Sequence, residues 1–381
     1  MKIKQKRYEN LVLVVSIINC VKLYFYENRT IEILSLIASF LILSYLFLRS
    51  NLLRNKKVTV MLACVGGSLL LTAVINGGAG AALNYVCLIL SSLIFTSYGV
   101  RKSFMKKLFC LTGVALLLFL LLLNKRPNYS TYIFSTVFNT QINSNMVGII
   151  AAIAFFCLFC FSSVIKEFYV RLIVQIAVTI ICSYYVIVSD CRSAMLAIIV
   201  FFICYLFKKK TIKQKKFKNI VMVSQICSIL FVLVYLYAYK YPTFATLQLL
   251  GKSLYSGRQI VWGSAWDVAL QYPLIGSGGA VELLGVAGTH TTSAHNTVMS
   301  LLYMFGFIPT VFYFVFMGKK YDKFSKSEPC RLNQFAVLGT LVITVFETFY
   351  MESYLGCLAM LFFMTALPQN YECINNNKEK T

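Results

Sequence analysis

The sequence predicts an all-α, polytopic membrane helix bundle with about 12 transmembrane helices and one long extracytoplasmic loop. Three observations predict this fold class: an apolar composition, a succession of apolar runs of membrane-spanning length, and basic residues gathered in alternate connections. Of the 381 residues, 59% are hydrophobic and 13% are charged, and the mean hydropathy is +0.74. Soluble domains carry about 25% charged residues, so a water-soluble enzyme is excluded.

Twelve apolar runs bounded by polar residues each predict a helix, because backbone groups in hydrocarbon must be hydrogen-bonded within their own segment. The runs span residues 10–27, 31–48, 58–75, 82–98, 106–123, 145–165, 171–189, 192–207, 219–239, 296–317, 332–348 and 353–368. The first run follows a basic stretch, as a signal peptide does. It lacks a small-residue cleavage site, so we expect a retained first span.

The net charge of +23 would suggest nucleic-acid binding in a soluble protein, but here it orients the bundle. Of the 36 Lys and Arg residues, 28 lie in alternate connections, seven lie on the opposite side, and Lys22 lies within a span. Cytoplasmic connections are enriched in Lys and Arg, so both termini are expected in the cytoplasm. The basic run 208–218 is then expected to face anionic lipid head groups, and no nucleic-acid partner is expected.

The spans and connections predict four parts of the chain. These are N-terminal membrane helices and an outer loop (1–144), central membrane helices carrying Arg192 (145–239), a long extracytoplasmic loop (240–295), and C-terminal membrane helices with a short cytoplasmic tail (296–381).

The long loop is compositionally unlike a linker, because it holds both tryptophans, both histidines and eight of the twenty glycines. Within it, Trp262, Trp266, Ala269 and Leu270 recur at the spacing of one helix face. Tryptophan favours water–lipid boundaries, so this helix is expected to lie along the outer head-group layer. Earlier in the chain, residues 76–80 predict only a tight outer turn.

The two histidines, His290 and His295, are the first candidates for chemistry in this loop. His295 directly precedes an apolar helix, whose dipole disfavours an imidazolium at this end, and a neutral histidine is a usable general base. The two histidines are an alternative metal site. They stand in a Thr/Ser-rich stretch without Cys or carboxylate at ligand spacing, so neither a metal nor another cofactor is expected.

Arg192 and Arg258 are expected on the outer side, where two guanidinium groups could bind a diphosphate bidentately. Each also has a plainer interpretation: an ion pair with Asp190 for Arg192, and simple solvation for Arg258. Glu347, at the last outward turn, would either hydrogen-bond sugar hydroxyls or mark a polar helix end.

A set of ordered motifs resembles the signature of the O-antigen ligase and polymerase family, whose polymerase branch is called Wzy-type. The motifs are Ser256-Gly257-Arg258, Trp262, Tyr272-Pro273-Leu274-Ile275-Gly276-Ser277-Gly278, Ala294-His295-Asn296 and Gly306. Upstream, Ser189-Asp190-Cys191-Arg192-Ser193-Ala194 is similar to the family's Ser-Arg-(Ser/Thr)-Ala stretch, with Cys191 in place of the serine. The resemblance covers roughly residues 145–365.

The resemblance implies a GT-C-like enzyme of the bacterial cytoplasmic (inner) membrane that catalyses metal-independent, inverting glycosyl transfer on the outer face. The donor would be a polyprenyl-diphosphate-linked oligosaccharide, and the acceptor would be the hydroxyl of another lipid-linked repeat unit. Arg192 and Arg258 would bind the diphosphate, and His295 would deprotonate the hydroxyl. The residues expected around the substrate are Asn296, His290, Glu347 and Trp262. Membrane lipids, a flippase and a chain-length regulator are the further expected partners.

Two alternatives remain open. A ligase of the same family would pass the glycan to a lipid, wall or protein acceptor. A transporter of lipid-linked oligosaccharides, such as a flippase, is the alternative of another class. Transporters tend to carry ionisable residues near the membrane midplane, whereas these spans are nearly free of charge apart from Lys22.

Overall fold

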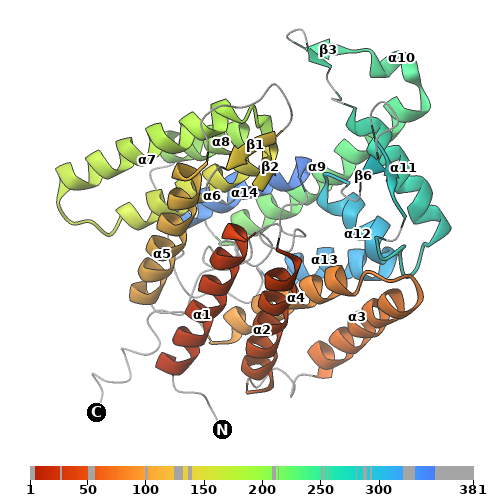
Figure 1. The fold of residues 1–381 in the computed structure, drawn as a ribbon, viewed down its shortest axis with the longest axis horizontal. Helices are drawn as coiled ribbons and strands as arrows, with labels where there is room; N and C mark the ends of the chain where they lie inside the picture. The colour runs from red at the N-terminus through yellow and green to blue at the C-terminus, as the bar shows by residue number, and fades with distance from the viewer. Residues whose placement is uncertain are drawn as a thin grey trace.

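The computed structural model of the chain is built almost wholly from helices (Figure 1). The structure describes residues 5–25, 28–49, 56–98, 102–123, 132–135, 140–207, 212, 214–249, 252–253, 255, 257–279, 281–285, 290–291, 294–320 and 331–347. Within them, fourteen helices and three two-stranded antiparallel sheets are present.

The helices are α1 (Gln5–Tyr24), α2 (Arg29–Leu48), α3 (Lys56–Ile75), α4 (Ala79–Tyr98), α5 (Lys102–Leu121), α6 (Ser144–Ser162), α7 (Phe168–Val188), α8 (Arg192–Phe207), α9 (Gln214–Lys240), α10 (Pro242–Ala245), α11 (Arg258–Gln271), α12 (Thr297–Phe305), α13 (Phe307–Lys320) and α14 (Arg331–Phe346). The paired strands are β1 (Tyr132–Ser135) with β2 (Thr140–Asn143), β3 (Gln248–Leu249) with β4 (Lys252–Ser253), and β5 (Leu283–Leu284) with β6 (His290–Thr291).

The helical character of the predicted runs is confirmed wherever the structure describes them, and the last run, 353–368, lies outside the described residues. The run 296–317 differs from the prediction because it forms two helices, α12 and α13, that meet at Gly306. Gly306 has a φ of 76°, and a Cβ there would lie 2.5 Å from the carbonyl of Leu274. A positive φ and a close backbone approach both require glycine, so a tertiary contact breaks this helix.

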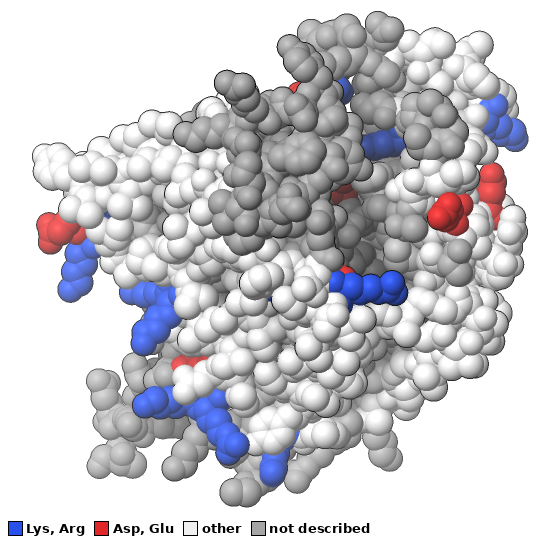
Figure 2. Space-filling model, in the orientation of Figure 1, with Lys and Arg blue, Asp and Glu red and all other residues white. Residues whose placement is uncertain are grey.

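Four of the described helices are long and apolar enough to cross a membrane: Arg29–Leu48, Ser144–Ser162, Phe168–Val188 and Lys216–Lys240. On α7, large apolar side chains such as Ile173, Ile180 and Ile187 are 63–66% exposed, which suits contact with lipid chains. Figure 2 shows few charged side chains across the described surface, with several Lys and Arg near its lower left edge. The chain is therefore a helical membrane protein; the number of spans stays a prediction.

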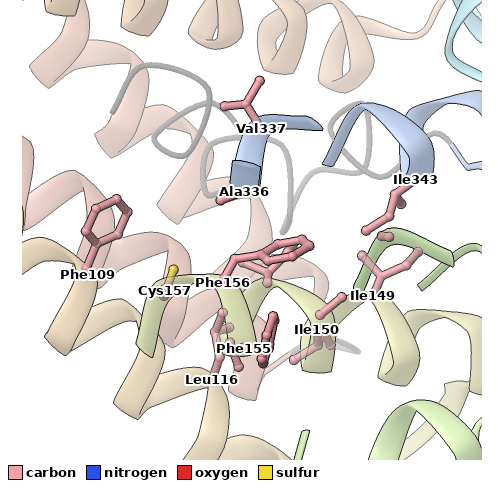
Figure 3. Packing of buried hydrophobic residues seen from close by; sticks show 14 of the residues in the cluster. Phe109, Leu116, Ile149, Ile150, Phe155, Phe156, Cys157, Ala336, Val337 and Ile343 are labelled. Carbon is pink, nitrogen blue, oxygen red and sulfur yellow. The ribbon is translucent and has the colours of Figure 1, made fainter. Parts of the chain in front are cut away.

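The core of the bundle is α6, which is apolar on all sides and almost entirely buried. Figure 3 shows Phe155 and Phe156 of α6 between side chains of α5, such as Leu116, and of α14, such as Ala336. The α7 and α8 helices cover another side of α6. A rigid, fully packed centre of this kind gives the connections at its ends fixed positions.

One of these connections, the turn between α7 and α8, rests directly on α6 at Gly148. A Cβ at Gly148 would lie 2.3 Å from the Cβ of Cys191 and 2.6 Å from the Oγ of Ser189. The preceding residue of the turn, Asp190, has a φ of 50°, an uncommon conformation outside glycine. The missing side chain of Gly148 therefore lets the turn that carries Arg192 approach the core.

Replacement of Gly148 by alanine should destabilise the protein by about 1–3 kcal/mol, because the new methyl group overpacks this contact. Thermal unfolding of the purified protein measures the effect. Gly66→Ala is the matched control on α3, because nothing lies within 4 Å of the added methyl group. Equal unfolding temperatures for the two variants would contradict the close packing of this turn against α6.

The described part of the segment predicted as a long outer loop contains α11, which packs against α9 and α12 (Figure 1). At Gly263 a Cβ would lie 2.3 Å from the ring of Tyr239, so α11 and α9 approach closely. Trp262 is 0% exposed and its ring centre lies 4.2 Å from that of Tyr235. The helix is confirmed and Trp262 faces protein, while the predicted place of the helix in the head-group layer stays a prediction.

The segment after α11 joins two further parts of the bundle. Ser277 and Gly278 donate their backbone N–H groups to the carbonyls of Tyr303 and Met304 at the end of α12, both at 2.9 Å. On its other side this segment contacts the turn between α3 and α4, where the Nδ2 of Asn76 donates to the carbonyl of Gly276 at 2.6 Å. The turn at residues 76–80 therefore does more than reverse the chain, because it docks α3 and α4 onto the segment that follows α11.

Candidate active site

Three segments that are far apart in sequence meet at the carboxylate of Glu347. Its Oε1 accepts a hydrogen bond from the Nη2 of Arg258 at 2.5 Å, and its Oε2 lies 3.1 Å from the Nδ1 of His295. Arg258 is the first residue of α11, His295 stands two residues before α12, and Glu347 directly follows α14. We name these three residues the Glu347 cluster.

Arg258 is fixed by two acceptors from the same segment. Its Nη1 donates to the backbone carbonyl of Phe346 at 2.5 Å while its Nη2 donates to Glu347. Gly257, the residue before it, has a φ of 77° and starts α11 at this point. The side chain of Arg258 is 19% exposed, so its planar guanidinium is held in one orientation at the edge of the protein interior.

The backbone of His295 is held in a conformation that histidine rarely adopts, with a φ of 49°. Residues held in this way cost on the order of 1–3 kcal/mol and cluster at functional sites. A carboxylate only accepts hydrogen bonds, so the proton of a neutral His295 is on Nδ1 and points to Glu347. Its Nε2 then carries the lone pair of the ring, and such a nitrogen is what a general base needs.

Glu347 is buried, with its side chain 7% exposed, and is charged. Burial alone would raise the pKa of its carboxyl, but Arg258, and after it His295, lower it by more, so that the pKa lies below its usual value. The carboxylate is therefore ionised at neutral pH and holds both partners. The sequence placed Glu347 among the sugar-binding residues, whereas the structure commits both of its oxygens to protein side chains.

The lowered pKa of Glu347 predicts how the stability of the fold changes with pH, and this prediction can be tested. A carboxyl whose pKa is lower in the folded than in the unfolded state stabilises the fold above its ordinary pKa of 4.5, and this stabilisation is lost as the pH falls through the folded value. Glu347→Gln should therefore cost about 3 kcal/mol near pH 7, where it leaves Arg258 without its counter-charge, and much less near pH 3.

Thermal unfolding across this pH range measures the effect. Glu282→Gln is the control, because that carboxylate is 65% exposed and, within the described part of the chain, lies beside the exposed side chain of His290. A Glu347→Gln penalty that stays constant between pH 7 and pH 3 would contradict the ionised, paired carboxylate.

Asn296, a predicted substrate contact, instead holds the cluster together. Its Oδ1 accepts from the backbone N–H of Met299 at 3.0 Å and so caps α12. Its Nδ2 donates to the carbonyl of Val345 at 2.7 Å and lies 3.5 Å from the Oγ of Ser228 on α9. The buried amide of Asn296 thus has three protein partners and positions its neighbours His295 and Glu347, while its predicted contact with substrate stays a prediction.

His290, another predicted substrate contact, lies elsewhere. It sits on β6, its side chain is 60% exposed, and its Nδ1 lies 3.7 Å from the Oε2 of Glu282. The two histidines are thus paired with different carboxylates, and the described contacts do not join His290 to the Glu347 cluster. Trp262, the remaining predicted contact, is buried, and its Nε1 has no hydrogen-bond partner within the described part of the chain.

Arg192 begins α8 and is exposed, and two neighbours relate it to the cluster. Burial raises the pKa of the adjacent Cys191 thiol to about 11, and the charges of Glu347 and Arg258 also act on this thiol. The phenol of Tyr235 interacts electrostatically with both Arg192 and Arg258. The turn that carries Arg192 therefore lies within electrostatic range of the Glu347 cluster, and Tyr235 lies within range of both arginines.

The geometry defines a class of protein: a membrane protein with an oriented histidine, a buried carboxylate and two nearby arginines, which suits transfer chemistry on an anionic substrate. Residues 177–314 of the chain match the family model Wzy_C, described as O-antigen ligase. This match confirms the family resemblance over those residues and includes Arg192, Arg258 and His295, while Glu347 lies beyond it. No curated protein and no solved structure matches the chain.

Proposed function

We propose that the chain is a membrane glycosyltransferase that transfers a glycan from a polyprenyl diphosphate to the hydroxyl of a lipid-linked repeat unit. The family match supports ligase- or polymerase-type activity, and the donor, the acceptor and the residue roles are our inference. The reaction takes place on the outer face of the bacterial cytoplasmic membrane, without a metal. The four predicted parts of the chain, 1–144, 145–239, 240–295 and 296–381, belong to this proposal.

The observation that carries the proposal is the bridge from Arg258 through Glu347 to His295. The Nε2 of His295 takes the proton of the acceptor hydroxyl as the oxygen attacks the anomeric carbon. Glu347 then faces a positively charged imidazolium, which its carboxylate stabilises. Because the oxygen enters opposite the leaving group, one attack inverts the configuration at the anomeric carbon.

The leaving group in this reaction is the polyprenyl diphosphate. The bond between the anomeric carbon and the diphosphate oxygen breaks, and its electron pair stays on the phosphate. Arg192 and Arg258 stabilise this charge, and such pre-aimed donors typically contribute 10²–10³ in rate each. Glu347 offsets part of the charge of Arg258 before substrate binds, and the exposed Arg192 supplies a second cation.

Polymerase is our first proposal and ligase the second, and chain length on the lipid carrier distinguishes them. A host that lacks a polymerase accumulates single lipid-linked repeats on the outer face, whereas a host that lacks a ligase accumulates long lipid-linked chains. A host that lacks a transporter retains the repeats on the cytoplasmic face. Deletion of the protein, followed by sizing and side-specific labelling of the lipid-linked glycan, therefore tests all three, and we expect single repeats on the outer face.

A further inference from the structure

One face of α9 forms the wall behind the Glu347 cluster. Ser228, Phe231 and Tyr235 lie at the i, i+3 and i+7 positions of this helix, so they share a face. Ser228 lies within 3.5 Å of the Asn296 amide, and the ring of Phe231 lies 5.2 Å from that of Phe346, the residue before Glu347. The third residue, Tyr235, contacts α11.

Two contacts place Tyr235 beside Arg258. Its ring centre lies 5.0 Å from that of Tyr255 and 4.2 Å from that of Trp262. Tyr255 precedes Arg258 by three residues, and its carbonyl accepts a hydrogen bond from the backbone N–H of Arg258 at 3.0 Å. Trp262 follows Arg258 by four residues on the same helix face. The two aromatic rings therefore hold Tyr235 against the first turn of α11, next to Arg258.

We propose that Tyr235 is a further diphosphate-binding residue, whose hydroxyl donates a hydrogen bond to a phosphate oxygen held between Arg192 and Arg258. The inference rests on the proposed function, because it assigns a third donor to the same leaving group. It also rests on the ring contacts with Tyr255 and Trp262, which place Tyr235 beside the start of α11. The charges of both guanidinium groups act on its phenol, which agrees with this position.

The chemistry of a tyrosine suits this position. A neutral phenol donates a strong hydrogen bond to an ionised phosphate oxygen. Tyr235 is 6% exposed, and the stacked rings of Tyr255 and Trp262 limit its rotation, so little conformational entropy is lost when it binds. Tyr235 does not take part in the proton transfer, which stays with His295.

The test measures binding of geranylgeranyl diphosphate to the full-length protein in lipid nanodiscs, with geranylgeraniol as the uncharged comparison. We expect Tyr235→Phe to weaken diphosphate binding about tenfold or more and to leave alcohol binding and the unfolding temperature unchanged. The matched control is Tyr255→Phe, which removes an equally buried hydroxyl from the same aromatic cluster and should leave both affinities unchanged.

Wild-type diphosphate affinity for Tyr235→Phe would overturn the inference, and so would an equal loss in Tyr255→Phe. Failure of the proposed function gives a different result: the wild-type protein then binds the diphosphate no better than the alcohol.

Discussion

His295→Asn is expected to slow glycan transfer by about 10²–10⁴-fold without loss of the folded protein. Asparagine tolerates the left-handed backbone conformation that His295 adopts, with its φ of 49°, and its amide can still donate to Glu347. It cannot take the proton of the acceptor hydroxyl. The variant therefore removes the base and keeps the geometry, and the initial rate of glycan extension by the purified protein measures the loss.

His290→Ala is the matched control, because it removes the chain's second histidine from an exposed hairpin where Glu282 is its ion-pair partner. Its rate should stay close to that of the wild type. Full activity of His295→Asn would remove His295 from the chemistry. A large loss in His290→Ala would instead support the substrate contact that the sequence predicts for it.

Arg258→Lys is expected to lower the rate about 10²–10³-fold although the charge is retained. The guanidinium donates through Nη1 to Phe346 and through Nη2 to Glu347, both at 2.5 Å, and a single ammonium cannot reproduce this fork. The variant should lose both an aimed donor for the diphosphate and the support of the carboxylate that orients His295. Steady-state rates with a lipid-linked donor measure the loss.

Arg171→Lys is the matched control for this substitution. Arg171 lies on α7, where its guanidinium stands 5.6 Å from the ring centre of Phe168, and it has no contact with the cluster among those described. We expect its rate to remain near that of the wild type. A wild-type rate for Arg258→Lys would show that charge alone suffices at this position and would contradict the two-point geometry.

The sequence predicts most of the helices because apolar run length is a local property. It does not predict the break at Gly306, because this break depends on the approach of Leu274, 32 positions earlier in the chain. It also does not predict the surroundings of Trp262, because the spacing of apolar residues shows that a helix has a buried face but not whether lipid or protein covers it. In the structure, α9 covers Trp262.

In the site, too, the sequence predicts local features but not the contacts between distant segments. Arg192, Arg258 and His295 are found from their motifs and residue types. The pairing of His295 with Glu347 is not found in this way, because Glu347 follows His295 by 52 residues and no spacing rule relates the two positions. The protein partners of Asn296 are not found either, since a polar side chain beside a motif has no sequence signal for whether it meets substrate or protein. Only the packing of α9, α11 and α14 decides this.

The central claim is that the chain breaks the bond between a glycan and a polyprenyl diphosphate on the outer face. The most direct test supplies the purified protein, in nanodiscs without nucleotide or metal, with the lipid-linked repeat unit isolated from its host. Free polyprenyl diphosphate and longer lipid-linked glycans are then quantified together. We predict one free polyprenyl diphosphate for each new glycosidic bond, and almost none with His295→Asn. Glycan growth without release of polyprenyl diphosphate, or equal release by His295→Asn, would contradict the account.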